Sequence, residues 1–64
     1  MDHLPEHDIP MLVSAINFLL RDEEFDNLAQ ICYHFDIARS VLEAKLATEG
    51  FVYSAKKNRI WQPL

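Results

Sequence analysis

The sequence predicts a small α+β fold, mainly α, in which three helices precede a C-terminal β-hairpin. Apolar residues recur at helical spacing in three successive segments up to Gly50, and the pattern after Gly50 alternates as in strands. The second and third helices are predicted to form a helix-turn-helix, so the order of elements is that of a minimal winged helix. The 64 residues allow a single domain, 1–64, which buries only about 60% of its unfolded surface.

Residues 1–7 are predicted to be irregular, and the first helix is predicted over 8–22. Asp8 is a good N-cap, and Pro10 falls in the first turn, where its missing N–H costs nothing. A narrow polar stripe of Ser14, Asn17 and Arg21 is expected opposite the core. The inward face is predicted to consist of Ile9, Leu12, Val13, Ile16, Leu19 and Leu20.

Met11, Ala15 and Phe18 make the apolar arc of this helix unusually wide. We favour the interpretation that other elements cover the helix on two sides. The alternative is that Met11 and Phe18 lie at an exposed margin and contact a partner or a second copy of the chain.

The segment from Asp22 to Asp26 is expected to be a solvated acidic linker. Asn27 caps a second helix over 27–35, with Gln30 in a variant of the capping box. Asp36 occupies the corner, where a positive φ is easier for Asp than for most residues. The third helix is predicted over 38–49, with Leu42 and Leu46 facing inward beside Val41 and Gly50 as terminator.

The hairpin is predicted over 51–61, with one strand around Phe51 to Tyr53 and the other around Arg59 to Trp61. Asn58 in the intervening loop can adopt a left-handed conformation. Two strands alone are marginally stable, so their aromatic residues are expected to pack on the helices.

A set of motifs recurs in order along nearly the whole chain: Leu4-Pro5, Asp8-x-x-Met11-Leu12-x-Ser14-x-x-Asn17-x-x-Leu20-Arg21-Asp22, Leu28 with Ile31-Cys32, Leu46, Gly50-Phe51-x-Tyr53 and Asn58. With these motifs the chain resembles a family of short bacterial proteins, domain of unknown function 4250. The family implies no activity, but it identifies a polar set: Ser14, Asn17, Arg21 and Asp22. These residues either hold neighbouring backbone and pair with one another or form a polar recognition patch.

The charge is unevenly distributed along the chain, whose formal net charge is −4. Residues 1–36 contain eight acidic residues and one basic residue, whereas residues 37–64 contain five basic residues and two acidic ones. A single cysteine excludes an internal disulfide, and the acidic start lacks the positive region of a signal peptide. The longest apolar run, residues 11–20, is far shorter than the ~20 residues of a membrane span. We therefore expect a cytoplasmic protein without membrane contact.

No catalytic or metal-binding constellation is evident in the sequence. His3 and His7 have ligand spacing but lie around Pro5 without further ligands, and Cys32 and His34 do not face each other on a helix. A single glycine excludes a phosphate-cradling loop. We therefore expect a non-enzyme without a cofactor or a small-molecule substrate.

Two functions remain open, and we favour protein–protein binding, by a homodimer or an adaptor, over nucleic-acid binding. The candidate protein interface is Met11, Phe18, Ser40, Ala44 and Ala47, in which small side chains on the third helix allow close approach of another helix. The candidate nucleic-acid contacts are Arg39, Lys45, Lys56, Lys57 and Arg59. The outer face of the third helix carries Glu43 but none of the Arg, Lys, Asn or Gln side chains that usually read bases.

Overall fold

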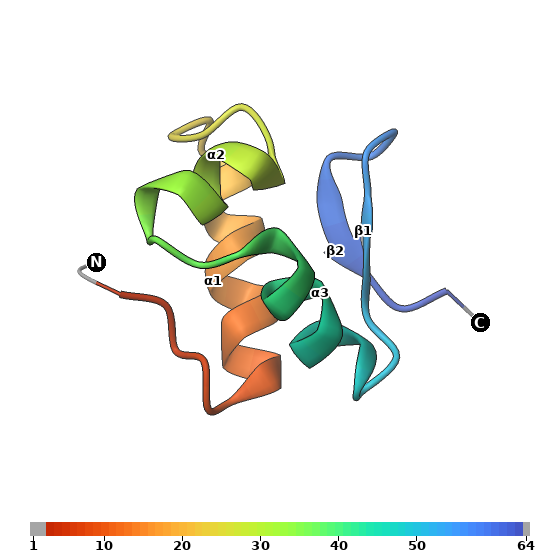
Figure 1. Cartoon of the computed structure of the whole chain (residues 1–64). Coiled ribbons are helices and arrows are strands. Elements are labelled where there is room, and N and C mark those ends of the chain that lie inside the picture. The colour runs from red at the N-terminus through yellow and green to blue at the C-terminus, as the bar shows by residue number, and fades with distance from the viewer. Residues whose placement is uncertain (1–2, 64) are drawn as a thin grey trace.

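The computed structural model describes residues 3–63, and within them three helices precede a two-stranded antiparallel hairpin, as predicted (Figure 1). The elements are α1 (Ile9–Arg21), α2 (Leu28–His34), α3 (Arg39–Ala47), β1 (Val52–Ser54) and β2 (Arg59–Trp61). The predicted helix ranges extend one or two residues further at their ends, because they include capping and turn residues. β1 begins one residue later than predicted, after Phe51. The first two residues of the predicted irregular segment 1–7 lie outside the described residues.

Two of the three helix starts carry the predicted side-chain caps. The N–H of Met11 donates to Oδ1 of Asp8 at 3.1 Å, and the N–H of Gln30 donates to Oδ1 of Asn27 at 3.0 Å. The Gln30 side chain also completes the capping box in a variant form. Its Oε1 accepts from the N–H of Asp26, the residue before the N-cap Asn27, at 2.8 Å. The N-cap position of α3 is Ala38, which has no side chain that can cap the helix.

The three helices end with the same backbone motif, a left-handed residue followed by a hydrogen bond back across the last turn. The left-handed residues are Glu23 (φ 61°), Asp36 (φ 54°) and Gly50 (φ 81°). In each case the next N–H bonds to a carbonyl five residues back: Glu24 to Leu19, Ile37 to Cys32 and Phe51 to Leu46. These are Schellman caps, and they confirm the predicted roles of Asp36 and Gly50.

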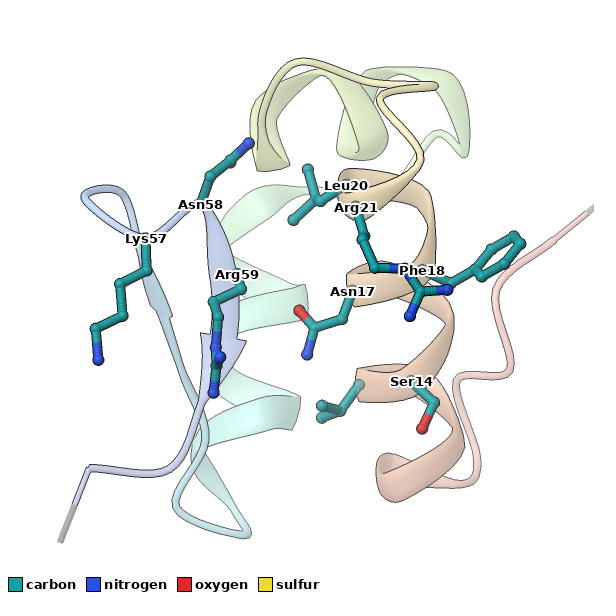
Figure 2. Close-up of a pocket in the computed structure, with 9 residues that line it drawn as sticks. Ser14, Asn17, Phe18, Leu20, Arg21, Lys57, Asn58 and Arg59 are labelled. Atoms are coloured by element: carbon teal, nitrogen blue, oxygen red, sulfur yellow. The ribbon is translucent and has the colours of Figure 1, made fainter.

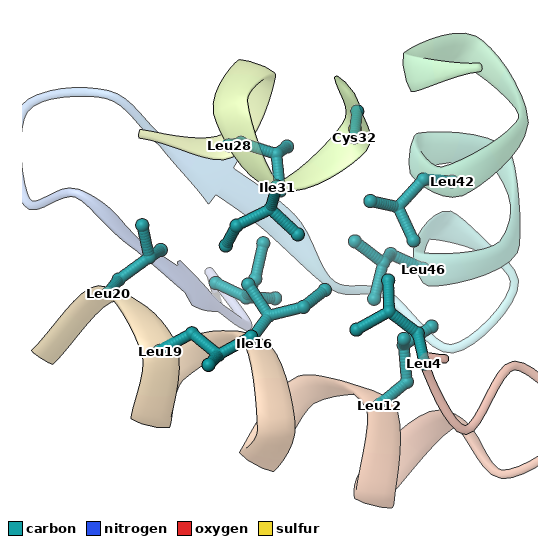
Figure 3. Close-up of a cluster of buried hydrophobic side chains, with 11 residues drawn as sticks. Leu4, Leu12, Ile16, Leu19, Leu20, Leu28, Ile31, Cys32, Leu42 and Leu46 are labelled. Atoms are coloured by element: carbon teal, nitrogen blue, oxygen red, sulfur yellow. The ribbon is translucent and has the colours of Figure 1, made fainter. Parts of the chain in front are cut away.

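The core lies between α1 on one side and α2 and α3 on the other (Figure 3). It consists of Leu4, Leu12, Ile16, Leu19, Leu20, Leu28, Ile31, Cys32, Leu42, Leu46 and Ile60. Leu4 belongs to the segment predicted to be irregular, yet only 3% of it is exposed. Val41 was predicted beside the inward stripe of α3, but it is 48% exposed, because Leu42 and Leu46 alone fill the inward side.

The hairpin closes the side of the core between α1 and α3. β2 lies against α1 and β1 against α3, with Tyr53 opposite Ile60 in the antiparallel register. Ile60 is 1% exposed and joins the helical core, whereas Val52 on the other side of the hairpin is exposed. The hairpin loop is fixed to the connection between α1 and α2 by Asn58, whose Nδ2 donates to the carbonyl of Asp26 at 2.9 Å. None of the helices in residues 3–63 is long and apolar enough to cross a membrane.

Candidate functional site: the groove between α1 and β2

A groove of about 650 Å³ lies between α1 and the β2 end of the hairpin (Figure 2). We refer to it as the α1–β2 groove. It is lined by Val13, Ser14, Asn17, Phe18, Leu20, Arg21, Lys57, Asn58 and Arg59. Its wall is therefore built from one face of α1 and from hairpin residues about forty positions later in the chain.

Asn17 fixes the distance between the two walls of the groove. Its Oδ1 accepts from the N–H of Ile60 at 2.7 Å, and its Nδ2 donates to the carbonyl of Ile60 at 3.0 Å. The side chain thus pairs with the outer edge of β2 as a neighbouring strand would, and it satisfies an otherwise open edge. Asn17 is half-buried, which corrects the prediction that it lies on a polar stripe opposite the core.

Three basic side chains surround the groove. Arg21 lies at the C-terminal end of α1, and Lys57 and Arg59 come from the hairpin. In Figure 2, Asn17 points from α1 toward β2, whereas the Arg59 side chain extends along β2. These three cations gather at the groove although the chain as a whole is acidic, and the carboxylate of Asp22 lies 3.6 Å from Arg21.

Two of these basic side chains stack on aromatic rings. The Arg21 guanidinium lies over the Phe18 ring at 5.5 Å from its centroid, and Lys57 Nζ lies over the Trp61 ring at 4.0 Å. Arg21 also approaches Oδ1 of Asp22 at 3.6 Å, but both side chains are well exposed, so this pair contributes little to stability. The rings hold the cations at the surface and leave their outer donors available.

The outer side of α1 forms the rim of the groove. Met11 and Phe18 are 56% and 47% exposed, and Ser14 lies exposed between them. Met11, Ser14, Phe18 and Arg21 follow one another at three or four residues, so they share one helix face. We call this set of four residues, together with the α1–β2 groove, the α1 face.

A protein-family model described as Domain of unknown function (DUF4250) matches residues 6–60. The chain belongs to this family. The match covers α1, both helices that follow it and the hairpin up to Ile60, so the DUF4250 domain includes both walls of the groove. The family description assigns no activity. No curated protein matches the chain, and no solved structure matches it.

In this DUF4250 chain the residues of the candidate protein interface occupy two separate surfaces. Met11 and Phe18 project from the outer side of α1. Ser40, Ala44 and Ala47 are exposed on α3, whose core residues face those of α1 (Figure 3). A single partner helix cannot cover both surfaces.

The residues of the candidate nucleic-acid surface are also divided. Arg39 is paired with Glu43 at 3.5 Å and lies over the Tyr53 ring at 5.4 Å, and Lys45 is half-buried on α3. Lys56 is exposed in the hairpin loop, whereas Lys57 and Arg59 border the α1–β2 groove. α3 therefore offers little free positive charge.

The candidate polar patch has mixed roles. Arg21 pairs with Asp22, as the structural interpretation expected, whereas Asn17 bonds to the backbone of Ile60 in the hairpin and not to neighbouring backbone. Ser14 and Arg21 are exposed at the groove. The sequence did not indicate that Val13 and Asn58 also line it, because no local signal shows that β2 lies against α1.

The remaining chemically reactive groups are dispersed. Within residues 3–63 there is no group of three or more His, Cys, Asp or Glu side chains able to hold a metal ion. Cys32 is buried in the core, and its burial raises the pKa of the thiol; Arg39 opposes this effect and Glu43 adds to it. A buried thiol with a raised pKa is a poor nucleophile.

Proposed function

We propose that this domain is a non-enzymatic protein-binding module and that the α1 face is its binding surface. Its partner is a protein segment that carries apolar side chains flanked by carboxylates. The gathering of Phe18, Arg21, Lys57 and Arg59 around one groove is the observation that supports this function best.

The apolar part of the α1 face suits a helical partner. α1 has 13 residues and is about 20 Å long, which is enough for a partner helix of three to four turns. Met11 and Phe18 are seven residues apart on the same side, so both can contact one partner along its length. Their burial would remove apolar surface that the monomer leaves in water.

The charged part of the α1 face selects an acidic partner. Arg21 and Arg59 line the groove beside the exposed apolar residues, and the Lys57 amine lies over Trp61 further along the hairpin, so carboxylates of a bound segment would meet their exposed donors. Charges in this position accelerate association and exclude basic partners more than they add affinity.

Nucleic-acid binding is the second candidate, because Lys56, Lys57 and Arg59 also concentrate charge on the hairpin. The surface of α3, the helix that would read bases in a helix-turn-helix, argues against nucleic-acid binding. Arg39 is engaged by Glu43 and Tyr53, and the exposed positions Ser40, Ala44 and Ala47 carry no long polar side chain.

An amide NMR titration of the ¹⁵N-labelled chain separates the two candidates. The first probe is an amphipathic peptide of about 18 residues with leucine at helical spacing and glutamate between. The second is mixed-sequence duplex DNA at low salt and again with added salt. We expect the peptide to shift the amides of Ser14, Phe18, Arg21 and Arg59 saturably.

Two variants test whether the peptide binds at the α1 face. Phe18→Ala should weaken peptide binding, whereas Val41→Ala, which truncates an equally exposed apolar residue on α3, should not. Salt-sensitive shifts around Arg39, Lys45 and Lys56 to Arg59 with DNA, and none with the peptide, would replace this function with nucleic-acid binding.

A further inference from the structure

We propose that β1 pairs with β1 of a second copy of the chain, antiparallel about a two-fold axis beside Tyr53, so that the two hairpins form one four-stranded sheet. The surface involved is the outer edge of the hairpin, which is not part of the α1 face. The inference therefore goes beyond the proposed function and does not depend on it.

The hydrogen bonds of Asn17 determine which backbone groups of the hairpin remain open. The N–H and C=O of Ile60 both bond to the Asn17 side chain, so they point toward α1 and away from β1. Ile60 lies opposite Tyr53 in the register, and this pair therefore exchanges no ladder hydrogen bonds. The N–H and C=O of Tyr53 consequently point outward from the free edge of β1.

The outer edge of β1 has no counterpart of Asn17. Among residues 3–63 the hydroxyl of Tyr53 donates to Asn58, but no backbone group or side chain bonds to the outward N–H or C=O of Tyr53. Figure 2 shows β2 between α1 and β1, and in this view no helix or further strand of the described chain lies beyond β1. An extended chain can therefore approach this edge.

The two open groups of Tyr53 are complementary to themselves. A hydrogen-bonded antiparallel pair exchanges one N–H···O=C bond in each direction. Tyr53 of a second copy presents the same donor and the same acceptor, so a two-fold axis between the two residues satisfies all four groups at once.

The residues around Tyr53 accept this pairing without a conflict of charge. Val52 of each copy lies opposite the uncharged Ser54 of the other on the outer side of the sheet. Glu49 precedes β1 by three residues and Lys56 follows it by two, and both are exposed. Antiparallel pairing therefore brings Lys56 of each copy toward the end of the other that carries Glu49.

A hollow of about 250 Å³ beside the same edge supplies apolar surface. The hollow lies between α3 and β1 and is lined by Glu43, Leu46, Ala47, Phe51, Val52 and Tyr53. Its only charged residue, Glu43, lies 3.5 Å from the guanidinium of Arg39, so its charge is compensated. In the dimer the hollows of the two copies adjoin across the axis.

The dimer should be weak, because β1 has only three residues. Interfaces below the standard size are typical of transient complexes, and we expect a dissociation constant on the order of 0.1–1 mM. Sedimentation equilibrium measures association in this range.

Hydrogen exchange at the Tyr53 amide is the specific readout, because this N–H is open in the monomer and bonded in the dimer. Its exchange rate, measured by NMR, should fall by about two- to threefold between about 0.05 and about 2 mM protein. The amide of Ser40, in the first turn of α3 where no side chain caps the helix, is the control. Its exchange rate should not depend on concentration.

Two substitutions at Tyr53 separate the backbone bond from the side chain. Tyr53→Pro removes the N–H, and proline is tolerated on an edge strand where that N–H faces solvent. Tyr53→Val is the matched control, since it removes the same ring and hydroxyl but keeps the N–H. The dissociation constant of the proline variant should exceed that of the valine variant by about tenfold or more.

A charge exchange tests the antiparallel register and does not alter Tyr53. Val52→Lys with Ser54→Lys places two pairs of cations opposite each other across the axis, and Val52→Glu with Ser54→Glu places two pairs of carboxylates there. Each double variant should dimerise about tenfold more weakly than the wild type. An equimolar mixture should form a heterodimer, because every lysine then faces a glutamate. Circular dichroism and Trp61 fluorescence verify that each variant is folded.

Three results overturn the pairing: a wild-type chain that is monomeric at about 2 mM, a dimer in which the exchange of the Tyr53 amide is not slowed, or a charged mixture that does not associate. The α1 face stays free in the dimer, because β2 separates β1 from α1 (Figure 2). Loss of the dimer with intact binding of the acidic peptide at the α1 face refutes this inference alone. Absence of peptide binding with a slowed Tyr53 amide refutes the proposed function alone.

Discussion

Asn17 shows how one side chain can set the position of a whole hairpin. A two-stranded hairpin has two open edges, and β2 would expose its backbone N–H and C=O groups toward α1. The amide of Asn17 has one donor and one acceptor group at the spacing of these backbone groups, and it pairs with both at Ile60. Helix α1 and the hairpin are thereby joined by polar as well as apolar contacts.

We expect Asn17→Ala to lower the free energy of unfolding by roughly 2 kcal/mol, because it leaves the N–H and C=O of Ile60 without these partners in a half-buried site. Urea denaturation followed by circular dichroism measures the loss. Ser14→Ala, one turn earlier on α1 and exposed, should change stability by no more than a few tenths of a kcal/mol. Equal effects of the two substitutions would show that Asn17 does not hold the hairpin.

The raised pKa of the Cys32 thiol predicts that the domain loses stability at alkaline pH. Burial raises the pKa of its thiol above the ordinary value of 9.0, so the unfolded chain loses this proton at lower pH than the folded chain does. The stabilisation that the buried, protonated thiol gives the folded state is therefore fully present below about pH 9. It decreases as the pH rises toward the pKa of the folded state.

The measurement is the free energy of unfolding of the wild type and of Cys32→Ala between neutral and strongly alkaline pH. All other ionisable groups are common to both proteins, so the difference between the two free energies isolates the thiol. The wild type should lose stability relative to the variant as the pH rises. A pH-independent difference would mean that the thiol titrates alike in the folded and unfolded chains.

The Schellman cap of α1 places Glu23 in the left-handed conformation, which glycine adopts more easily than glutamate. Glu23 ends α1 at φ 61°, where its Cβ is strained, whereas the equivalent residue after α3 is Gly50. Glu23→Gly should raise the free energy of unfolding by about 0.5–1 kcal/mol, because relief of strain exceeds the added entropy of the unfolded chain.

The neighbouring Glu24 is the control for this substitution, since it is equally exposed but has no positive φ. Glu24→Gly should leave stability unchanged or lower it. Thermal unfolding by circular dichroism distinguishes the two variants, because 1 kcal/mol shifts the midpoint of a domain this small by about 4–8 °C. A lower midpoint for Glu23→Gly would show that this cap carries no strain.

Local signals account for the elements that the sequence predicted. Asp8 and Asn27 act within the first turn of their own helices, and Asp36 and Gly50 adopt the left-handed conformation that their residue types favour. Glu23 gave no such signal, because glutamate has no preference for a positive φ. The periodicity of α1 likewise placed its buried leucines correctly, since burial repeats with the helical turn.

Contacts between distant segments account for what the sequence did not predict. Leu4 is buried and Val41 is exposed because of where their segments lie in the tertiary structure. Neither position has a local sequence signal that indicates its burial. Asn17 and Ile60 are 43 residues apart, so a single sequence carries no record of their pairing. The α1–β2 groove follows from that pairing and was therefore not predicted as one site.

The hairpin and the three helices share one core, which predicts that they unfold together. β2 lies against α1, β1 lies against α3, and Ile60 is buried among the helical leucines. A domain of this length has a free energy of unfolding of roughly 3–10 kcal/mol, so the loss of a single core contact is a large fraction of it. Trp61, the only tryptophan, reports on the hairpin, and far-ultraviolet circular dichroism reports on the helices.

Ile60→Ala should therefore destabilise the whole domain by about 2–4 kcal/mol and shift the fluorescence and circular-dichroism transitions to lower urea by the same amount. Val52→Ala, on the exposed side of the same hairpin, should cost far less. If the Trp61 signal of Ile60→Ala changes at lower urea than the helical signal, the helices persist without the hairpin. The core would then be helical alone, and α1 would expose to solvent the side that β2 covers in the intact chain.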